Sequence, residues 1–333
     1  MPNKPVQQHY LPKKAYLKFF ESPEKEGSIW MYQRKGEPVL ASIENVAKER
    51  HLYSFTDENG NYNYELEVAF SEMEQIASNI LKKMNEATGE IFLTGQEKFD
   101  LAYFLAMQAA RTPAFRELQK KQAEEFAKLN MKARASNKDI LARDLERTRK
   151  ENPGLPDVSV EDMQDFIMND RYKLDWGKKN DNYFLKQAIE LGDHIFPTVA
   201  MKDILMLKSE FEFITSDYPV MLISDPSIPP FWAGGFLHSG ILFPIGKNTA
   251  LFLKNPLKPT QPPAADEQIV VGYKKIAPAF ARWVNKTVIG YTERFLFSSS
   301  LEPKIKEIFD KTEPPKRFYM DSPFNKDKER DEG

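Results

Sequence analysis

Few side chains in this sequence have both the type and the spacing that chemistry requires. The sequence contains four histidines, His9, His51, His194 and His238, and no cysteine. Without cysteine, disulfides, thiolate nucleophiles and cysteine-ligated zinc or iron–sulfur sites are excluded. The histidines lack the spacing of an HExxH zinc site, and no GxxxxGK[ST], GxGxxG or GxSxG pattern is present. Any chemistry must therefore come from a less regular combination of residues.

A Ser–Asp pair at an expected strand end is the first such combination. The stretch 211–220, FEFITSDYPV, predicts a strand that ends at Ser216 and Asp217, because Pro219 cannot donate a ladder hydrogen bond. Such a pair either serves a pocket or closes a turn. A neutral imidazole next to a carboxylate is an effective general base or metal-ligand pair. We therefore expect an active centre to join His9 with Asp217 and Ser216; a structural His9–Asp217 hydrogen bond is the alternative.

Two glutamates and an arginine form the second combination. Glu67 and Glu74 lie seven positions apart in an expected helix, which places them on one face. Together with His9 and Asp217 they predict a divalent-metal site for phosphodiester hydrolysis, and ordinary solvated glutamates are the alternative. Arg111 ends the most apolar expected helix. Its charge either offsets the helix dipole or binds a phosphate of the substrate.

The elements that must position these residues follow a simple order along the chain. Short alternating apolar segments predict strands at both ends, whereas residues of about 65–200 show helical periodicity. This segregation predicts an α+β fold, in which the β-rich N-terminal and C-terminal segments form one core with a large helical insert. We expect a single domain over residues 1–310 and a disordered tail over 311–333.

Composition limits the classes of function. Of 333 residues, 47 are basic and 49 are acidic, so the net charge of −2 gives no global reason to expect nucleic-acid binding, although a local patch is compatible with it. The longest apolar runs, such as 240–245, are far too short to span a bilayer. We expect a soluble, cytoplasmic protein with no membrane partner.

A set of short motifs in a fixed order points to a family. The set consists of His9-Tyr10-Leu11-Pro12, Tyr16-Leu17 with Phe19, Ser42-Ile43-Glu44-Asn45, Tyr53, the helix at 65–74, Arg111-Thr112-Pro113, the block 213–220, Phe243-Pro244, and Asn285 ahead of Phe295. In this order it resembles the uncharacterised "domain of unknown function 4238" family over roughly residues 7–300. Tyr218 departs from the usual Asn or Asp of the family, and Gly246 from a common Ser.

The resemblance implies a context and no established reaction. Members of similar type have turned up among bacterial anti-phage defence genes, which favours an effector harmful to the cell, such as a nuclease. Tyr10 and Asn45, which belong to the motifs, join Arg111 as candidates for substrate binding. A His–Asn–His arrangement of His9, Asn45 and His51 lacks the ββα frame that nucleases of that type need.

Two hypotheses about function follow. In the first, the protein is a defence effector that hydrolyses nucleic acid or nucleotides with the help of a divalent metal ion. In the second, it is a sensor or binding module without catalysis, which recognises a phage or cell component through the aromatic loop at 226–238.

Overall fold

The chain folds into two compact units. The computed structural model describes residues 7–57, 59, 61–174, 176, 179–224, 235–257 and 261–314. Helices and strands are both abundant among them, so the predicted α+β class is confirmed. The first unit comprises the described parts of Met1–Arg116 and Asn182–Pro315, and the second the described part of Glu117–Asp181.

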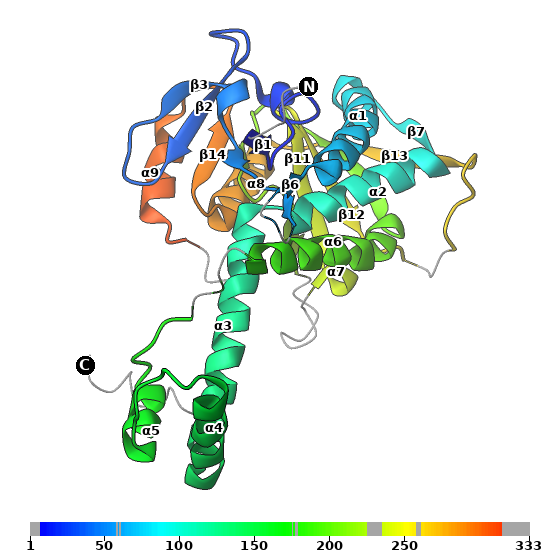
Figure 1. The fold of residues 1–333 in the computed structure, drawn as a ribbon. Helices are drawn as coiled ribbons and strands as arrows, with labels where there is room; N and C mark the ends of the chain where they lie inside the picture. Colours follow the sequence, from blue (N-terminus) through cyan, green and yellow to red (C-terminus); the bar gives the residue numbers. More distant parts are fainter. Residues whose placement is uncertain are drawn as a thin grey trace. The chain divides into compact units, whose positions relative to one another are not determined.

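A six-stranded sheet forms the centre of the first unit (Figure 1). Its strands lie in the order β10 (Met221–Ile223), β11 (Gly240–Gly246), β12 (Thr249–Lys254), β8 (Asp203–Lys208), β13 (Gln268–Lys275) and β7 (Ile91–Thr94). Neighbouring strands are antiparallel, except β8 and β13, which are parallel.

Each face of this sheet packs against a hydrophobic core. Successive side chains of a strand point to opposite faces, so each strand can contribute to both cores. In β8, Ile204 and Met206 pack in one core, and Leu205 and Leu207 pack in the other. Burial of each such side chain stabilises the fold by about 1.5–3 kcal/mol. The helices that contribute to the first core are α1 (Glu65–Glu86), α2 (Gly95–Ala110) and α6 (Lys179–Ala200), and those of the second are α8 (Pro278–Tyr291) and α9 (Pro303–Lys311).

A four-stranded antiparallel sheet joins the N-terminal and C-terminal β-rich segments. Its strands lie in the order β3 (Val39–Ser42), β2 (Ser28–Gln33), β14 (Phe295–Ser298) and β9 (Thr215–Ser216). The inner strand β14 pairs with β2, with Leu296 opposite Tyr32, and also with β9. The two β-rich segments therefore share one core, as predicted.

Short elements complete the described part of this unit. Strand β1 (Gln7–His9) pairs with β4 (Lys48–Arg50), and β5 (Phe55–Thr56) pairs with β6 (Tyr62–Asn63). The remaining short elements are the 3-10 helices η1 (Leu17–Phe20) and η2 (Ile43–Asn45) and the helix α7 (Gly235–His238). From residue 315 onward, the tail predicted over 311–333 lies outside the described residues.

Two predicted elements differ from the structure. The strand expected over 211–215 is a strand only in β9, because its backbone donors bond elsewhere. The Phe213 N–H donates to a carbonyl of the β11–β12 turn (2.7 Å), and the Ile214 N–H donates to Oδ1 of Asn285 (3.1 Å). The helical insert predicted over 65–200 also contains a strand, β7, which completes one edge of the six-stranded sheet.

The second unit consists of helices. It contains most of α3 (Pro113–Ala135), then α4 (Lys138–Glu151) and α5 (Val160–Met168). A small core is formed by Ala135, Leu141 and Ile167. Among the described helices of either unit, none combines the length and the apolar character needed to cross a bilayer.

The prediction of one domain over residues 1–310 requires that no N-terminal fragment folds alone. We expect a fragment of residues 1–64 to show no cooperative unfolding by circular dichroism, because β2 would lose its pairing with β14. Limited proteolysis of the whole chain should cut first within 152–156, an exposed part of the segment that joins α4 to α5. A stable, cooperatively folded 1–64 fragment would contradict the single-domain prediction.

Candidate functional site

Arg111 is a buried cation at the end of α2. Its exposed fraction is 2%, and its Nη2 lies 2.7 Å from Oε1 of Glu74 in α1. Nη2 also donates to Oε1 of Gln108 at 2.8 Å. The guanidinium lies over the rings of Phe70 and Tyr53, 4.9 and 5.7 Å from their centroids. Helices α1 and α2 and the segment at Tyr53 therefore converge on one positive charge.

Gln108 links this charge to the N-terminal segment. The residue is completely buried, and its Nε2 donates to the carbonyl of Tyr10 at 2.7 Å. Sequence reasoning missed Gln108, although an amide among the apolar residues of α2 is a signal, since a buried amide needs partners. Through Gln108, the guanidinium of Arg111 holds the backbone next to His9 in place.

Two N–H groups in this region have no hydrogen-bond partner among the described residues. They are Nη1 of Arg111 and Nη2 of Arg116, and both are buried. Arg116 lies in the first turn of α3. Burial raises the pKa of Tyr53, and the charges of Arg111 and Arg116 oppose the rise, so both cations lie near this ring. Buried donors without a partner are rare and costly, so their presence here favours an anion as the missing partner.

Glu67 is a half-buried carboxyl close enough to Arg111 for the guanidinium to affect its pKa. Burial raises the pKa of Glu67 to about 7, the Glu74 carboxylate contributes to the rise, and Arg111 opposes it. For Arg111, burial lowers the pKa, but Glu74, Tyr53 and Glu67 raise it on balance, so the guanidinium stays charged. A carboxyl that titrates near neutral pH is suited to general acid–base chemistry.

The structure thus brings together three of the residues singled out in the sequence, Glu67, Glu74 and Arg111. We call them, with Arg116, the arginine–glutamate cluster. Within the part of the chain that the structure describes, no three acidic or histidine side chains are grouped so as to hold a metal ion. The metal-ligand role of Glu67 and Glu74 stays a prediction.

Asp217 occupies a separate corner of the first unit. It is 2% exposed, and its carboxylate accepts hydrogen bonds from the backbone N–H groups of Glu293, Arg294 and Phe295 at 3.1, 2.7 and 3.2 Å. Burial raises the pKa of Asp217 to about 6, although these three hydrogen bonds oppose the rise. The carboxylate thereby ties the end of β9 to the loop that precedes β14.

Ser216 and Tyr10 lie next to this carboxylate. The Ser216 hydroxyl accepts a hydrogen bond from the Tyr218 N–H at 3.1 Å, as in the turn considered from the sequence. Burial raises the pKa of Tyr10, and so does the charge of Asp217, so the phenol is protonated. The nearby Arg294, which sequence reasoning missed, contacts Oε1 of Glu49 at 2.6 Å.

His9 and Asn45 lie in a third group of polar residues. Strand pairing sets His9 opposite Lys48, and Asn45 Oδ1 accepts a hydrogen bond from Nζ of Lys48 at 3.0 Å. Burial lowers the pKa of His9 to about 4, and Lys13 and Lys48 contribute to the shift. The ring is therefore neutral at pH 7, which suits a metal ligand better than a general base.

The interactions around His9 and Asp217 involve different neighbours. The charges that affect His9 are Lys13, Lys48 and Glu44, whereas those that affect Asp217 include Arg294. Tyr10 connects the groups, since its carbonyl bonds to Gln108 and its phenol lies near Asp217. The joint catalytic role of His9, Asp217 and Ser216 stays a prediction, as do substrate contacts by Tyr10 and Asn45.

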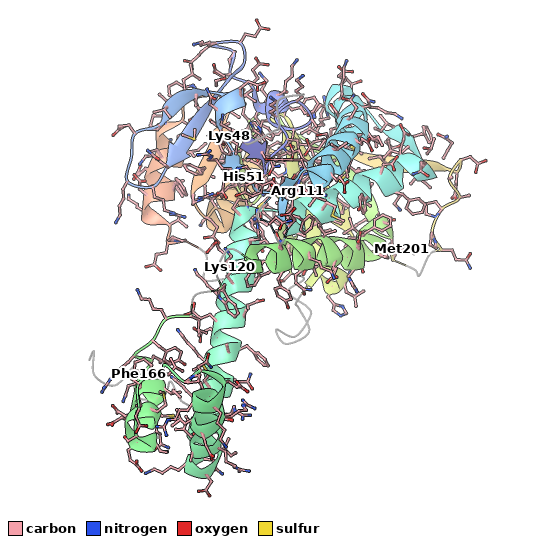
Figure 2. All side chains as sticks on the ribbon, in the orientation of Figure 1. Lys48, His51, Arg111, Lys120, Phe166 and Met201 are labelled. Atoms are coloured by element: carbon pink, nitrogen blue, oxygen red, sulfur yellow. The ribbon has the colours of Figure 1, made fainter. Side chains whose placement is uncertain are left out.

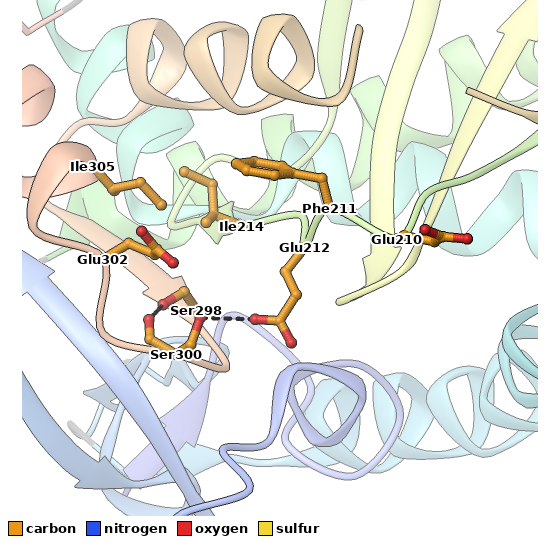
Figure 3. Close-up of a pocket in the computed structure, with 8 residues that line it drawn as sticks. All are labelled: Glu210, Phe211, Glu212, Ile214, Ser298, Ser300, Glu302 and Ile305. Atoms are coloured by element: carbon orange, nitrogen blue, oxygen red, sulfur yellow. Dashed lines mark hydrogen bonds between the residues drawn. The ribbon is translucent and has the colours of Figure 1, made fainter. Parts of the chain in front are cut away.

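A cavity of about 230 Å³ lies away from these residues (Figure 3). Its lining consists of Glu210, Phe211, Glu212, Ile214, Ser298, Ser300, Glu302 and Ile305. The Glu212 carboxylate accepts hydrogen bonds from the hydroxyls of Ser299 and Ser300, both at 2.7 Å. None of the residues predicted for the site lines it. Asn285, a residue of the family motifs, fixes this segment by donating to the Glu212 carbonyl at 2.9 Å.

The chain belongs to the family described as "Protein of unknown function (DUF4238)", whose model matches residues 7–302. The resemblance identified from the short motifs is thereby confirmed. No curated protein and no solved structure matches the chain. The arginine–glutamate cluster and the Asp217 corner both lie within the matched residues.

The raised pKa of Glu67 predicts a pH-dependent stability. With a folded-state pKa of about 7 against an ordinary 4.5, its stabilising contribution is complete below pH 4.5 and is lost as pH rises through 7. A shift of this size corresponds to about 3 kcal/mol, which solvent screening reduces to on the order of 1–2 kcal/mol. Urea denaturation of wild type and Glu67→Gln at pH 5 and pH 8 should show this difference. The control is Glu65→Gln in the same exposed first turn, and identical pH profiles for wild type and Glu67→Gln would contradict the prediction.

Removal of the Asp217 carboxylate should destabilise the protein. Asp217→Ala leaves three backbone N–H groups without their acceptor, and we expect a loss of about 1–3 kcal/mol or more in the free energy of unfolding. Urea denaturation measures it, with Asp266→Ala at an exposed position as the matched control. If catalysis alone requires Asp217, as the sequence hypothesis holds, the melting temperature will stay nearly unchanged while activity is lost.

Proposed function

We propose that this protein is a hydrolase that acts on nucleic acid or nucleotides, in which Arg111 binds a phosphate group and Glu67 transfers a proton. The observation that carries the proposal is the buried guanidinium of Arg111, whose Nη1 has no partner in the described part of the chain, near the half-buried carboxyl of Glu67. Nη2 and Nε of Arg111 already bond to Glu74 and Gln108, so Nη1 is the group that remains to donate to a phosphate oxygen.

The residues of the cluster have distinct roles in this proposal. Arg111 and Arg116 neutralise the charge that develops on the phosphate oxygens. Glu67, as a carboxylate, accepts the proton of the attacking water while the new P–O bond forms. The P–O bond to the leaving group breaks, and the leaving oxygen takes its proton from solvent. Arg116, Glu67 and Glu74 are partly exposed, so they connect the buried Arg111 with the surface.

A divalent metal ion belongs to the proposal as a separate component. Glu67 and Glu74 are the ligands that this chain would offer from the cluster, and a bound ion would supply further positive charge at the phosphate. A metal-ligand role of Glu67 requires the ion, whereas a proton-transfer role does not. Assays with added metal ion and with a chelator therefore distinguish the two roles.

The alternative of a non-catalytic sensor depended on the aromatic loop at 226–238. Residues 225–234 lie outside the described part of the chain, and α7 forms the remainder. No described contact favours the sensor over the hydrolase. We expect the hydrolase to act in the cytoplasm, as an effector in the defence context that the family resemblance implies.

The proposal predicts that Glu67→Gln lowers hydrolysis by about 10²- to 10⁴-fold, the usual contribution of a general acid or base. Purified protein is incubated with single-stranded RNA, single-stranded DNA, duplex DNA and nucleoside triphosphates, with Mg²⁺, Mn²⁺ or a chelator. Glu65→Gln is the matched control, and the melting temperature shows whether each variant is folded. Wild-type rates in Glu67→Gln, or no turnover of any substrate by wild type, would reject the proposal.

Cells provide a second readout of the same proposal. Expression with total RNA and DNA followed over time, with and without phage infection, should show degradation that Glu67→Gln prevents. Growth arrest with intact nucleic acid would instead support the non-catalytic sensor.

A further inference from the structure

Three aromatic side chains stand together where the β5–β6 hairpin meets α1. The rings of His51 and Tyr62 are parallel within 3°, and their centroids are 3.8 Å apart. The ring of Tyr64, the last residue before α1, lies 6.2 Å from His51 and 6.3 Å from Tyr62. We call these three residues the aromatic platform.

The aromatic platform differs from a buried core cluster in its exposure and from an ordinary turn in the backbone conformation of His51. Tyr62 is 40% exposed, so the stack is partly accessible to solvent. His51 has a φ of +53°, in the left-handed region that a residue with a side chain adopts at a cost in free energy. Its Nδ1 is buried and has no hydrogen-bond partner among the described residues. His51 thus adopts a costly backbone conformation within a stack that is partly accessible to solvent.

The platform lies beside the arginine–glutamate cluster. The Tyr64 carbonyl accepts a hydrogen bond from the Glu67 N–H at 3.1 Å, and the two residues are three positions apart, about 4.5 Å of helical rise. His51 precedes by two positions Tyr53, over whose ring Arg111 lies. Figure 2 labels His51 and Arg111 in the same region of the first unit.

We propose that the aromatic platform is a base-binding subsite, so that the ligand is a nucleotide or a single-stranded nucleic acid whose base stacks on Tyr62 while its phosphate meets Arg111 and Arg116. This inference rests on the proposed function and adds the class of substrate. Stacking on an aromatic ring needs an unpaired base, because the faces of bases in a duplex are covered. Tyr and His rings are common stacking partners for such bases.

The test compares a ligand that has a base with one that lacks it. Isothermal titration of the full chain with a nucleoside 5′-monophosphate and with ribose 5-phosphate should give an affinity about 5- to 150-fold higher for the nucleotide. In Tyr62→Ala this difference should disappear, with the affinity for ribose 5-phosphate unchanged. Tyr62→Phe, which keeps the ring, should retain the difference. The control is Tyr183→Ala, which removes another exposed tyrosine in α6.

The outcomes test the phosphate site and the base subsite separately. Equal affinities of wild type for both ligands would overturn the base subsite and leave the phosphate site intact. If wild type binds neither ligand, the phosphate site fails, and the base subsite fails with it. Should Tyr62→Ala not fold, Tyr62→Leu keeps an apolar side chain without a ring and is expected to lose the difference in the same way.

Discussion

The pairing of one buried guanidinium organises the N-terminal half of the first unit. A charge that leaves water must regain its lost solvation from the protein, and removal of a partner from such a charge typically costs several kcal/mol. For Arg111, the interactions that replace water come from Glu74 of α1, Gln108 of α2 and the ring of Tyr53. Because Gln108 also binds the Tyr10 carbonyl, the N-terminal segment is held by the same charge.

A buried carboxylate plays the corresponding part on the other side of Tyr10. Asp217 has three backbone N–H donors, two from the loop between α8 and β14 and one from Phe295, the first residue of β14. It therefore fixes the approach to β14, the strand through which both β-rich segments join. The two buried charges differ in one respect. The donors around Asp217 satisfy it, whereas Nη1 of Arg111 has no partner among the described residues, and for this reason we propose Arg111 as the ligand site.

The local sequence pattern correctly predicted features that depend on residues close together in the chain. Helical periodicity predicted α1 and placed Glu67 and Glu74 on one face, and the α+β segregation followed from the same reasoning. Contacts between distant segments were beyond it: Gln108 was missed because its partner Tyr10 lies 98 positions away. The strand expected over 211–215 was wrong for a similar reason, since Asn285, 71 positions from Ile214, takes the backbone donor that a neighbouring strand would have used.

The inner position of β14 has a consequence for synthesis of the protein. The Tyr32 hydroxyl donates to the Ser300 carbonyl, 268 positions further along the chain. During synthesis, β2 can pair with β3 early but lacks its second partner until β14 has left the ribosome, and contacts of such separation form slowly. For the proposed hydrolase, this order means that the residues of the proposed site, all of which precede β14, are synthesised before the four-stranded sheet can be completed.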